Sequence, residues 1–183
     1  IHYADWNYKN VNSPFARIYL VNEGMAKLHL PDNRVQELTP GHLYLIPPFT
    51  LHSYECNDFY ALYYIHIYES QTSSQHVLED YLYPVQIKAT QLDFLLVKQL
   101  ARINPGRELK QYDPLIYDNT PYLIERINLH SQNSKYAILE TKGILFQILA
   151  HFLRYSTNKY EITDNRILKV LRYIRKHINE NIS

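Results

Sequence analysis

Hydrophobic and polar residues alternate along the first half of the chain, and short turn sequences interrupt this alternation at regular intervals. Alternation with period two is typical of strands that bury one face. Pro47-Pro48 ends one such segment because prolines cannot donate to a strand ladder, and Asn57-Asp58 forms the next turn. Strands are therefore predicted over residues 15–22, 25–30, 35–38, 43–46, 51–55 and 59–68, with one more at 83–88. Short strands at this spacing indicate a sandwich or a small barrel.

The first thirteen residues are polar and aromatic and contain Trp6, the only tryptophan. They are consistent either with a first strand or with an arm that lies over the sheet.

The hydrophobic period changes to a helical one at Thr90, which is a suitable N-cap. Helices are predicted from Thr90 to about residue 103, over 121–130 and over 134–155, while 109–120 is predicted to be irregular. The helix over 134–155 carries the widest apolar stripe, wider than one packing neighbour requires. Asp164 is predicted to cap a last helix, whose apolar positions are Ile167, Leu171, Ile174 and Ile178. Nothing follows this helix for it to pack on, so we expect it to begin a further domain; the alternative is a terminal helix docked on its own domain.

Composition restricts the class of protein. Hydrophobic content of 46% and charged content of 20% are those of a soluble globular chain, and no apolar run is long enough to span a membrane. The single cysteine, Cys56, fits a reducing cytoplasm. A net charge of +1 gives no overall basic field for nucleic acid, and four glycines argue against phosphate-binding loops. The eighteen tyrosines suit a sugar-like or aromatic ligand, although tyrosine is also an ordinary strand residue.

A metal-dependent β-barrel enzyme of the cupin type is one candidate. Such sites use a His-x-His pair, a nearby Glu and a later His. Here His52 is followed by Ser53 and Tyr54, Glu55 points to the opposite face, and His66 lies on the next strand. We expect no bound metal, no cofactor and no catalytic site, because no known catalytic motif is present either.

A ligand pocket is the better candidate. Because side chains alternate, one face of each strand points inward. The predicted inner faces carry polar and aromatic groups amid aliphatic ones, namely Arg17, Tyr19, Val21, His52, Tyr54, Leu62, Tyr64 and His66. A register shift by one residue would instead place Ile18, Leu20, Ile65 and Ile67 inside and send Arg17 and His66 to solvent.

The sequence PGHLYLIPPFTLHSYE, residues 40–55, resembles the cupin-like sensor domain of AraC-type transcriptional regulators. That family typically has Pro-Gly-Asp, then Pro-Pro a few positions later, and then, after three further residues, His and an aromatic residue. Pro40-Gly41, Pro47-Pro48, His52 and Tyr54 fit, while His42 replaces the usual Asp. The strand YYIHIYE and the last twenty residues also resemble the family's next strand and its linker with the first DNA-binding helix.

The resemblance implies an α+β fold with three parts: a cupin-like effector-binding barrel over 1–88, a helical dimerisation region over 89–157, and a linker with the first helix of a helix-turn-helix domain over 158–183. It implies a cytoplasmic homodimer that binds a small effector, a sugar or a related polar metabolite, and that contacts DNA only through helices beyond Ser183. Val21 and Leu62 depart from the sugar contacts of arabinose-binding members, so arabinose is not implied. The predicted dimer interface comprises Leu145, Ile148, Leu149, Phe152 and Leu153.

Two alternatives stay open at this point. One is the metal-dependent cupin enzyme, an isomerase or a dioxygenase. The other is a barrel with a filled core that serves only as a scaffold for dimerisation.

Overall fold

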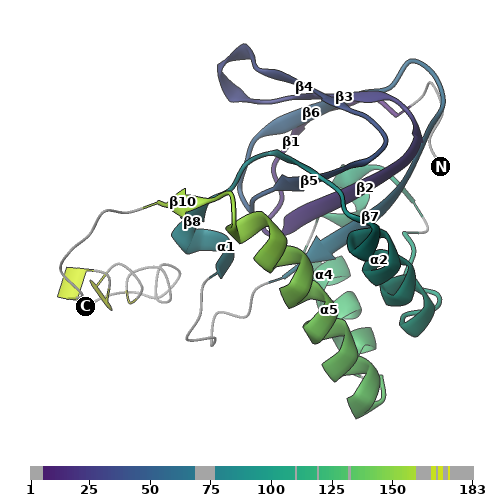
Figure 1. Ribbon diagram of the computed structural model, residues 1–183, viewed down its shortest axis with the longest axis vertical. Coiled ribbons are helices and arrows are strands. Elements are labelled where there is room, and N and C mark those ends of the chain that lie inside the picture. The colour runs from purple at the N-terminus through teal and green to yellow at the C-terminus, as the bar shows by residue number, and fades with distance from the viewer. Residues whose placement is uncertain are drawn as a thin grey trace.

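The computed structural model describes residues 6–68, 77–109, 111–118, 120–131 and 133–159, together with Arg166, Ile167, Lys169, Val170 and Tyr173. Figure 1 shows the strands gathered at one end of the molecule and the helices beside them. The class is mixed α+β with antiparallel sheets, which confirms the predicted fold class at that level.

The first sheet consists of β2 (Ala16–Gly24), β5 (His42–Ile46), β7 (Tyr60–Ile67) and β9 (Gln86–Lys88), in the order β7-β2-β5-β9. All of its pairs are antiparallel. The long strand β2 lies between β5 and β7 and places Arg17 opposite His66 and Tyr19 opposite Tyr64. This register fixes which side chains share a face of the sheet.

The second sheet consists of β1 (Tyr8–Val11), β3 (Ala26–His29), β4 (Val35–Leu38) and β6 (His52–Glu55), in the order β1-β6-β3-β4. A single 3-10 turn, η1 (Pro31–Asn33), joins β3 to β4. Gly24 begins the step from β2 to β3 with φ +75, and a Cβ there would lie 2.0 Å from the carbonyl oxygen of Phe59. Only glycine fits at position 24, because any side chain there would clash with the Phe59 backbone.

The two sheets enclose one core between them. Tyr19, Tyr44 and Ile46 of the first sheet pack there against Leu28 and Tyr54 of the second. Among the described residues the strand pairs form these two separate four-stranded sheets, plus a short pair of β8 (Tyr81–Leu82) with β10 (Thr157–Asn158). The arrangement is therefore that of two facing sheets, as the spacing of the strands predicted.

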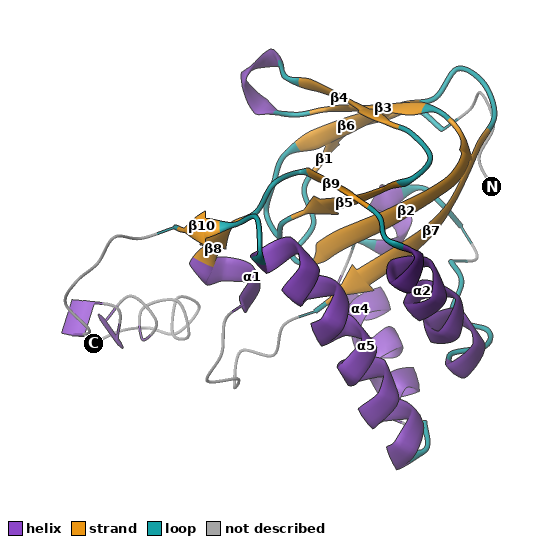
Figure 2. Ribbon diagram, viewed as in Figure 1, coloured by secondary structure: helices purple, strands orange, loops and turns teal. Residues whose placement is uncertain are grey.

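The helices are α1 (Val77–Asp80), α2 (Gln91–Ile103), α3 (Pro114–Tyr117), α4 (Thr120–Ser131) and α5 (Lys135–Leu153). Helices α2 and α5 cover the opposite face of the first sheet (Figure 2), whereas Tyr117 of α3 packs against Phe15 and Leu109. Val97 of α2 and Ile148 of α5 pack against Ile18 and Leu45 in a second core. Thr90 caps α2 in a reciprocal capping box with Asp93, as its position before the periodic residues predicted.

The outward face of β2 is thus Ala16, Ile18 and Leu20, which settles the register in favour of Arg17 and Tyr19 pointing inward. The first thirteen residues contribute a strand, β1, paired with β6. The segment 109–120, predicted to be irregular, contains the short helix α3, whose N-cap Asp113 accepts a hydrogen bond from the Leu115 amide.

The residues predicted to form the dimer interface have a different role. Ile148, Leu149 and Phe152 are buried in the chain's own core against the first sheet, Leu145 packs against the same cluster, and Leu153 is partly buried. The apolar stripe of α5 was wider than one neighbour needs because the sheet and α2 share it.

Most of the predicted linker and last helix, 158–183, lies outside the described residues, and the boundaries at 88 and 157 stay predictions. None of the helices that the structure describes is both long and apolar enough to cross a membrane.

Candidate functional site

Arg17 lies at the centre of the inner face of the first sheet. Its side chain is 1% exposed, although arginine is almost never fully buried without partners. Strand β2 aims it inward because Ile18 and Ala16, its neighbours in sequence, face the helices. Phe15 and Tyr117 flank the guanidinium, with centroids 4.8 and 5.3 Å from Cζ. A positive charge is thus held in an aromatic surrounding.

Four polar groups surround this guanidinium. Asp118 accepts from Nη2 at 2.9 and 3.2 Å, and Ser13 accepts a further bond from the same nitrogen. Nη1 donates to the Tyr117 hydroxyl at 2.8 Å and lies 3.2 Å from His66 Nε2. The Ser13 hydroxyl in turn donates to Asp118. Of the three guanidinium nitrogens of Arg17, Nε alone is buried without a hydrogen-bond partner among the described residues.

Tyr117 and Asp118 come from the end of α3, about 100 residues along the chain from Arg17. The same segment contributes Leu109, whose backbone amide donates to the Tyr64 hydroxyl at 2.7 Å. Leu109 and Tyr117 are buried there with Phe15. We call residues 109 and 111–118 the covering segment, because they lie over the open end of the inner face.

A chain of hydrogen bonds runs from Tyr19 into the second sheet. The hydroxyls of Tyr19 and Tyr54 are 2.5 Å apart, and Tyr54 lies 2.7 Å from His52 Nε2. His52 Nδ1 lies 2.6 Å from the carbonyl oxygen of Thr50. Because a carbonyl only accepts, Nδ1 donates, and the neutral ring accepts from Tyr54 through Nε2. Trp6 stacks on Tyr54 with ring centroids 4.4 Å apart.

Burial sets the protonation of this site. It lowers the pKa of His52 to about 4 and that of His66 well below its ordinary value, so both rings are neutral at pH 7. Burial alone lowers the pKa of Arg17, but the surrounding phenol oxygens and Asp118 raise it above its ordinary value. Arg17 is therefore a permanent cation beside neutral histidines.

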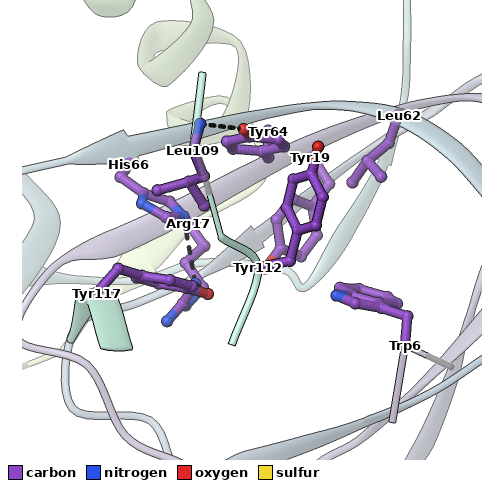
Figure 3. Close-up of a pocket in the computed structure, with 9 residues that line it drawn as sticks. All are labelled: Trp6, Arg17, Tyr19, Leu62, Tyr64, His66, Leu109, Tyr112 and Tyr117. Atoms are coloured by element: carbon purple, nitrogen blue, oxygen red, sulfur yellow. Dashed lines mark hydrogen bonds between the residues drawn. The ribbon is translucent and has the colours of Figure 1, made fainter. Parts of the chain in front are cut away.

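A small cavity remains between the sheets and the covering segment (Figure 3). Its volume is about 20 Å³, which is room for about one water molecule. Its lining is aromatic and aliphatic around one cation: Trp6, Arg17, Tyr19, Leu62, Tyr64, His66, Leu109, Tyr112 and Tyr117. Among the residues that the structure describes, no three His, Cys, Asp or Glu side chains gather closely enough to hold a metal ion.

Residues 1–112 of this chain match the family described as the AraC-like ligand binding domain. The chain belongs to this family. No match was found among curated protein sequences.

The solved structures similar to this AraC-like domain include ToxT from Vibrio cholerae. One ToxT structure has 12% identity and a TM-score of 0.45 over 100% of this chain and 65% of that chain. A ToxT structure described as bound to an unsaturated fatty acid has 14% identity and a TM-score of 0.37, over 72% of this chain and 50% of that chain. The present chain thus spans less than two thirds of the ToxT chains.

The DMSP lyase DddQ from Ruegeria pomeroyi DSS-3 is also similar over part of this AraC-like domain. The identity is 19% and the TM-score 0.32, over 40% of this chain and 38% of that chain.

The structure brings all eight predicted site residues of this AraC-like domain to the inner side of the sheets. Five of them line the cavity, namely Arg17, Tyr19, Leu62, Tyr64 and His66. Val21 is fully buried in the core behind the cavity, and His52 and Tyr54 support Tyr19 from the second sheet. All eight stay predicted ligand contacts, although Val21, His52 and Tyr54 do not line the cavity itself.

Sequence reasoning missed the residues that complete the site. Ser13 and Asp118 bind Arg17, while Leu109, Tyr112 and Tyr117 close the cavity. The only local signal was the pair Asp113-Pro114, a helix start in a stretch predicted to be irregular. Periodicity carries no information on where such a segment docks.

Proposed function

We propose that this AraC-like domain is the effector-sensing part of a transcriptional regulator. A small effector, a sugar or a related polar metabolite with an apolar surface, binds between the sheets beside Arg17. Its binding changes how a helix-turn-helix domain attached at the C-terminal end engages DNA. The chain acts by binding and not by catalysis, as a homodimer in the cytoplasm, with no cofactor.

The observation that carries this proposal is the buried cation. Arg17 is 1% exposed among aromatic side chains, and its Nε has no partner within the described residues. A buried charge destabilises a fold unless it is compensated, so a core arginine that serves packing alone would be expensive. Apolar walls with a few converging polar groups are the usual composition of a small-molecule site.

The size of the cavity constrains the mechanism. About 20 Å³ does not admit a metabolite, so an effector has to displace the side chains that fill the space. The covering segment is the group best placed to move, since it reaches the sheets through Leu109, Tyr117 and Asp118. A ligand that binds the open form better than the closed form then shifts the equilibrium between them.

The homodimer is proposed to form through the exposed face of α5. Tyr136, Leu139 and Phe146 are 74%, 73% and 56% exposed, and Gly143 between them has open space beside its Cα. These positions are spaced by three, four and three residues, which is the spacing of a helix-pairing seam. The opposite face of α5 packs against the first sheet, so a dimer formed in this way would be in contact with the helix that supports the site.

Two rival functions remain testable. A metal-dependent cupin enzyme needs three or four ligands, and the His, Cys, Asp and Glu side chains of the described residues form no such cluster. A pure scaffold needs a filled core but has no need of a buried Arg17 with a free donor.

A thermal-shift screen of sugars, sugar acids, aromatic acids and fatty acids tests the proposal. A ligand at one hundred times its dissociation constant adds about 2.7 kcal/mol, which raises the Tm of a domain of this size by roughly 5–10 °C. We expect at least one class to produce this shift in the wild-type chain and a smaller shift in Arg17→Lys. If no class shifts the Tm, the pair of sheets is a scaffold and the sensing proposal is wrong.

A further inference from the structure

We infer that the effector is an organic carboxylate with an apolar body, and that its carboxylate takes the place of Asp118 on Arg17. This inference rests on the proposed function, because it names the ligand class of the same site. It assigns Asp118 the role of an internal competitor that the effector has to displace.

The first step is the geometry of the pair. Both carboxylate oxygens of Asp118 lie within hydrogen-bond reach of the same guanidinium nitrogen, at 2.9 and 3.2 Å. Planar guanidinium groups recognise carboxylates with geometric specificity. The site therefore already binds one carboxylate, and an external one with the same shape fits the same donors.

The second step is the source of that carboxylate. Asp118 follows α3, a helix of only four residues, and its own amide donates back to the Pro114 carbonyl oxygen. The outer side of this short helix is open to solvent, with Leu115 88% exposed and Ile116 45% exposed. The carboxylate is therefore supplied by a short peripheral segment and not by one of the two sheets.

The third step is energetic. The Asp118 side chain is 12% exposed, and burial raises its pKa although Arg17 and Ser13 lower it. The desolvation of this carboxylate is thus not fully compensated by its partners. If the carboxylate of a ligand replaced Asp118 on Arg17, the Asp118 side chain would return to water, and the apolar body of the ligand would be buried instead.

The fourth step is what lies next to Arg17. Trp6, Tyr19 and Tyr64 contribute aromatic rings and Leu62 an aliphatic side chain to the lining of the same cavity (Figure 3). The nearby histidines are neutral, since burial lowers the pKa of both His52 and His66. Arg17 is the only charged side chain among the described residues that line the cavity, and one cation among apolar groups matches a monoanion with an apolar body better than an uncharged polyol or a dianion.

The fifth step links binding to the helices. The covering segment leads directly into α4, and Arg126 of α4 donates to the Glu108 carbonyl oxygen at 2.9 Å and to the Tyr122 hydroxyl at 2.9 Å. Arg107 in turn donates to the carbonyl oxygen of Leu129 and to Asn133. Displacement of Asp118 would therefore act on the segment that connects the sensing sheets to α4 and α5.

The test is a calorimetric titration of the 183-residue chain with two acids and their neutral isosteres. The probes are 3-phenylpropionate and hexanoate, against 3-phenylpropionamide and hexanamide. We expect each acid to bind about tenfold or more tightly than its amide, since the amide cannot replace a charge-assisted pair. In Asp118→Asn, which removes the competing charge, affinity for the acids should rise by about tenfold.

Asp113→Asn is the matched control, because asparagine also caps a helix and the change removes one negative charge from the same segment. Its affinities should equal those of the wild type. Circular dichroism confirms that both variants are folded. A further measurement uses the wild type alone. Saturating 3-phenylpropionate should increase the rate of amide hydrogen exchange at residues 111–118.

Four results would overturn the inference. If acids and amides bind equally well, or if Asp118→Asn leaves the affinity for acids unchanged, the carboxylate assignment fails while the sensing function stands. If ligands bind and residues 111–118 become more protected, Asp118 is not displaced. If no acid, amide or sugar binds the wild type or Asp118→Asn, the proposed function fails as well.

Discussion

At the scale of single residues, the central feature is a charged pair in a surrounding that is costly for charges. Arg17 and Asp118 are 1% and 12% exposed and lie 2.9 Å apart. Breaking such a pair by removing one partner is strongly destabilising, because the other charge is left uncompensated, whereas replacing both by apolar groups is often neutral.

Asp118→Ala should therefore lower the free energy of unfolding by about 3–5 kcal/mol. The double variant Arg17→Met/Asp118→Leu should recover most of this loss, because no charge is left in the core. Urea unfolding of the wild type, the singles and the double measures the coupling between the two sites. A double variant as unstable as the sum of its singles would show that the pair is held for packing and not for charge compensation.

The histidines of the inner face make the fold sensitive to acid. The pKa of His52 falls from its ordinary value of 6.5 to about 4, so the unfolded chain binds this proton and the folded chain does not between those pH values. The stability is complete above pH 6.5 and is lost as the pH falls toward 4. His66, whose pKa burial also lowers, acts in the same direction.

His52→Gln should flatten this dependence, since a glutamine side chain does not titrate. We expect the wild type to lose roughly 3 kcal/mol from His52 alone between pH 6.5 and pH 4, and the variant to keep that part. Urea unfolding across this range gives the measurement, with His29→Gln on the surface as the control. Equal slopes for wild type and His52→Gln would contradict the assignment of a buried neutral ring.

The residues also show where sequence reasoning was sufficient. Alternation along β2 predicted that Arg17 and Tyr19 share the inner face, because a strand offers only two faces and Ile18 and Leu20 occupy the other. The partner Asp118 could not be predicted, since it lies about 100 residues away and no periodic pattern relates the two.

At the scale of elements, α5 has two apolar faces with different neighbours. Ile144, Ile148 and Phe152 pack under the first sheet, while Tyr136, Leu139 and Phe146 are exposed. Its apolar periodicity predicted the helix but could not tell which face meets the sheet. The assignment of Ile148, Leu149 and Phe152 to a dimer interface followed from that ambiguity.

Leu139→Glu and Phe146→Glu together should convert the proposed dimer to a monomer without unfolding it, because both side chains are outside the chain's own core. Light scattering after size exclusion, with circular dichroism for the fold, measures this. Leu115→Glu, an 88% exposed leucine away from α5, is the control and should leave the mass unchanged. A wild type that is monomeric at micromolar concentration would contradict the seam.

The covering segment shows the limit of periodicity for short elements. Residues 109–120 read as irregular because α3 spans four residues, fewer than the period needed to define an amphipathic face. Its docking depends on tertiary contacts with Tyr64 and Arg17. Strands β2 to β7 were predictable because each repeats its pattern over several residues.

At the scale of the whole molecule, two facing sheets hold the site, and helices α2 and α5 lie on the far side of the first sheet. Ile18 and Leu45 contact the helices through side chains that alternate with Arg17 and Tyr44 on the same strands. A rearrangement at the inner face is therefore separated from α2 and α5 by a single sheet. A second connection runs through Glu108, the residue before the covering segment, whose carbonyl oxygen accepts a hydrogen bond from Arg126 of α4.

The central claim is that a small molecule binds between the sheets beside Arg17, and Trp6 offers the most direct test. It is the only tryptophan in the chain, it lines the cavity, and it stacks on Tyr54 and Tyr60. Each compound that raises the Tm of the wild-type chain should change the Trp6 emission with a saturating dependence on concentration. Compounds that raise the Tm but leave the Trp6 emission unchanged at saturation would bind elsewhere and would contradict the account.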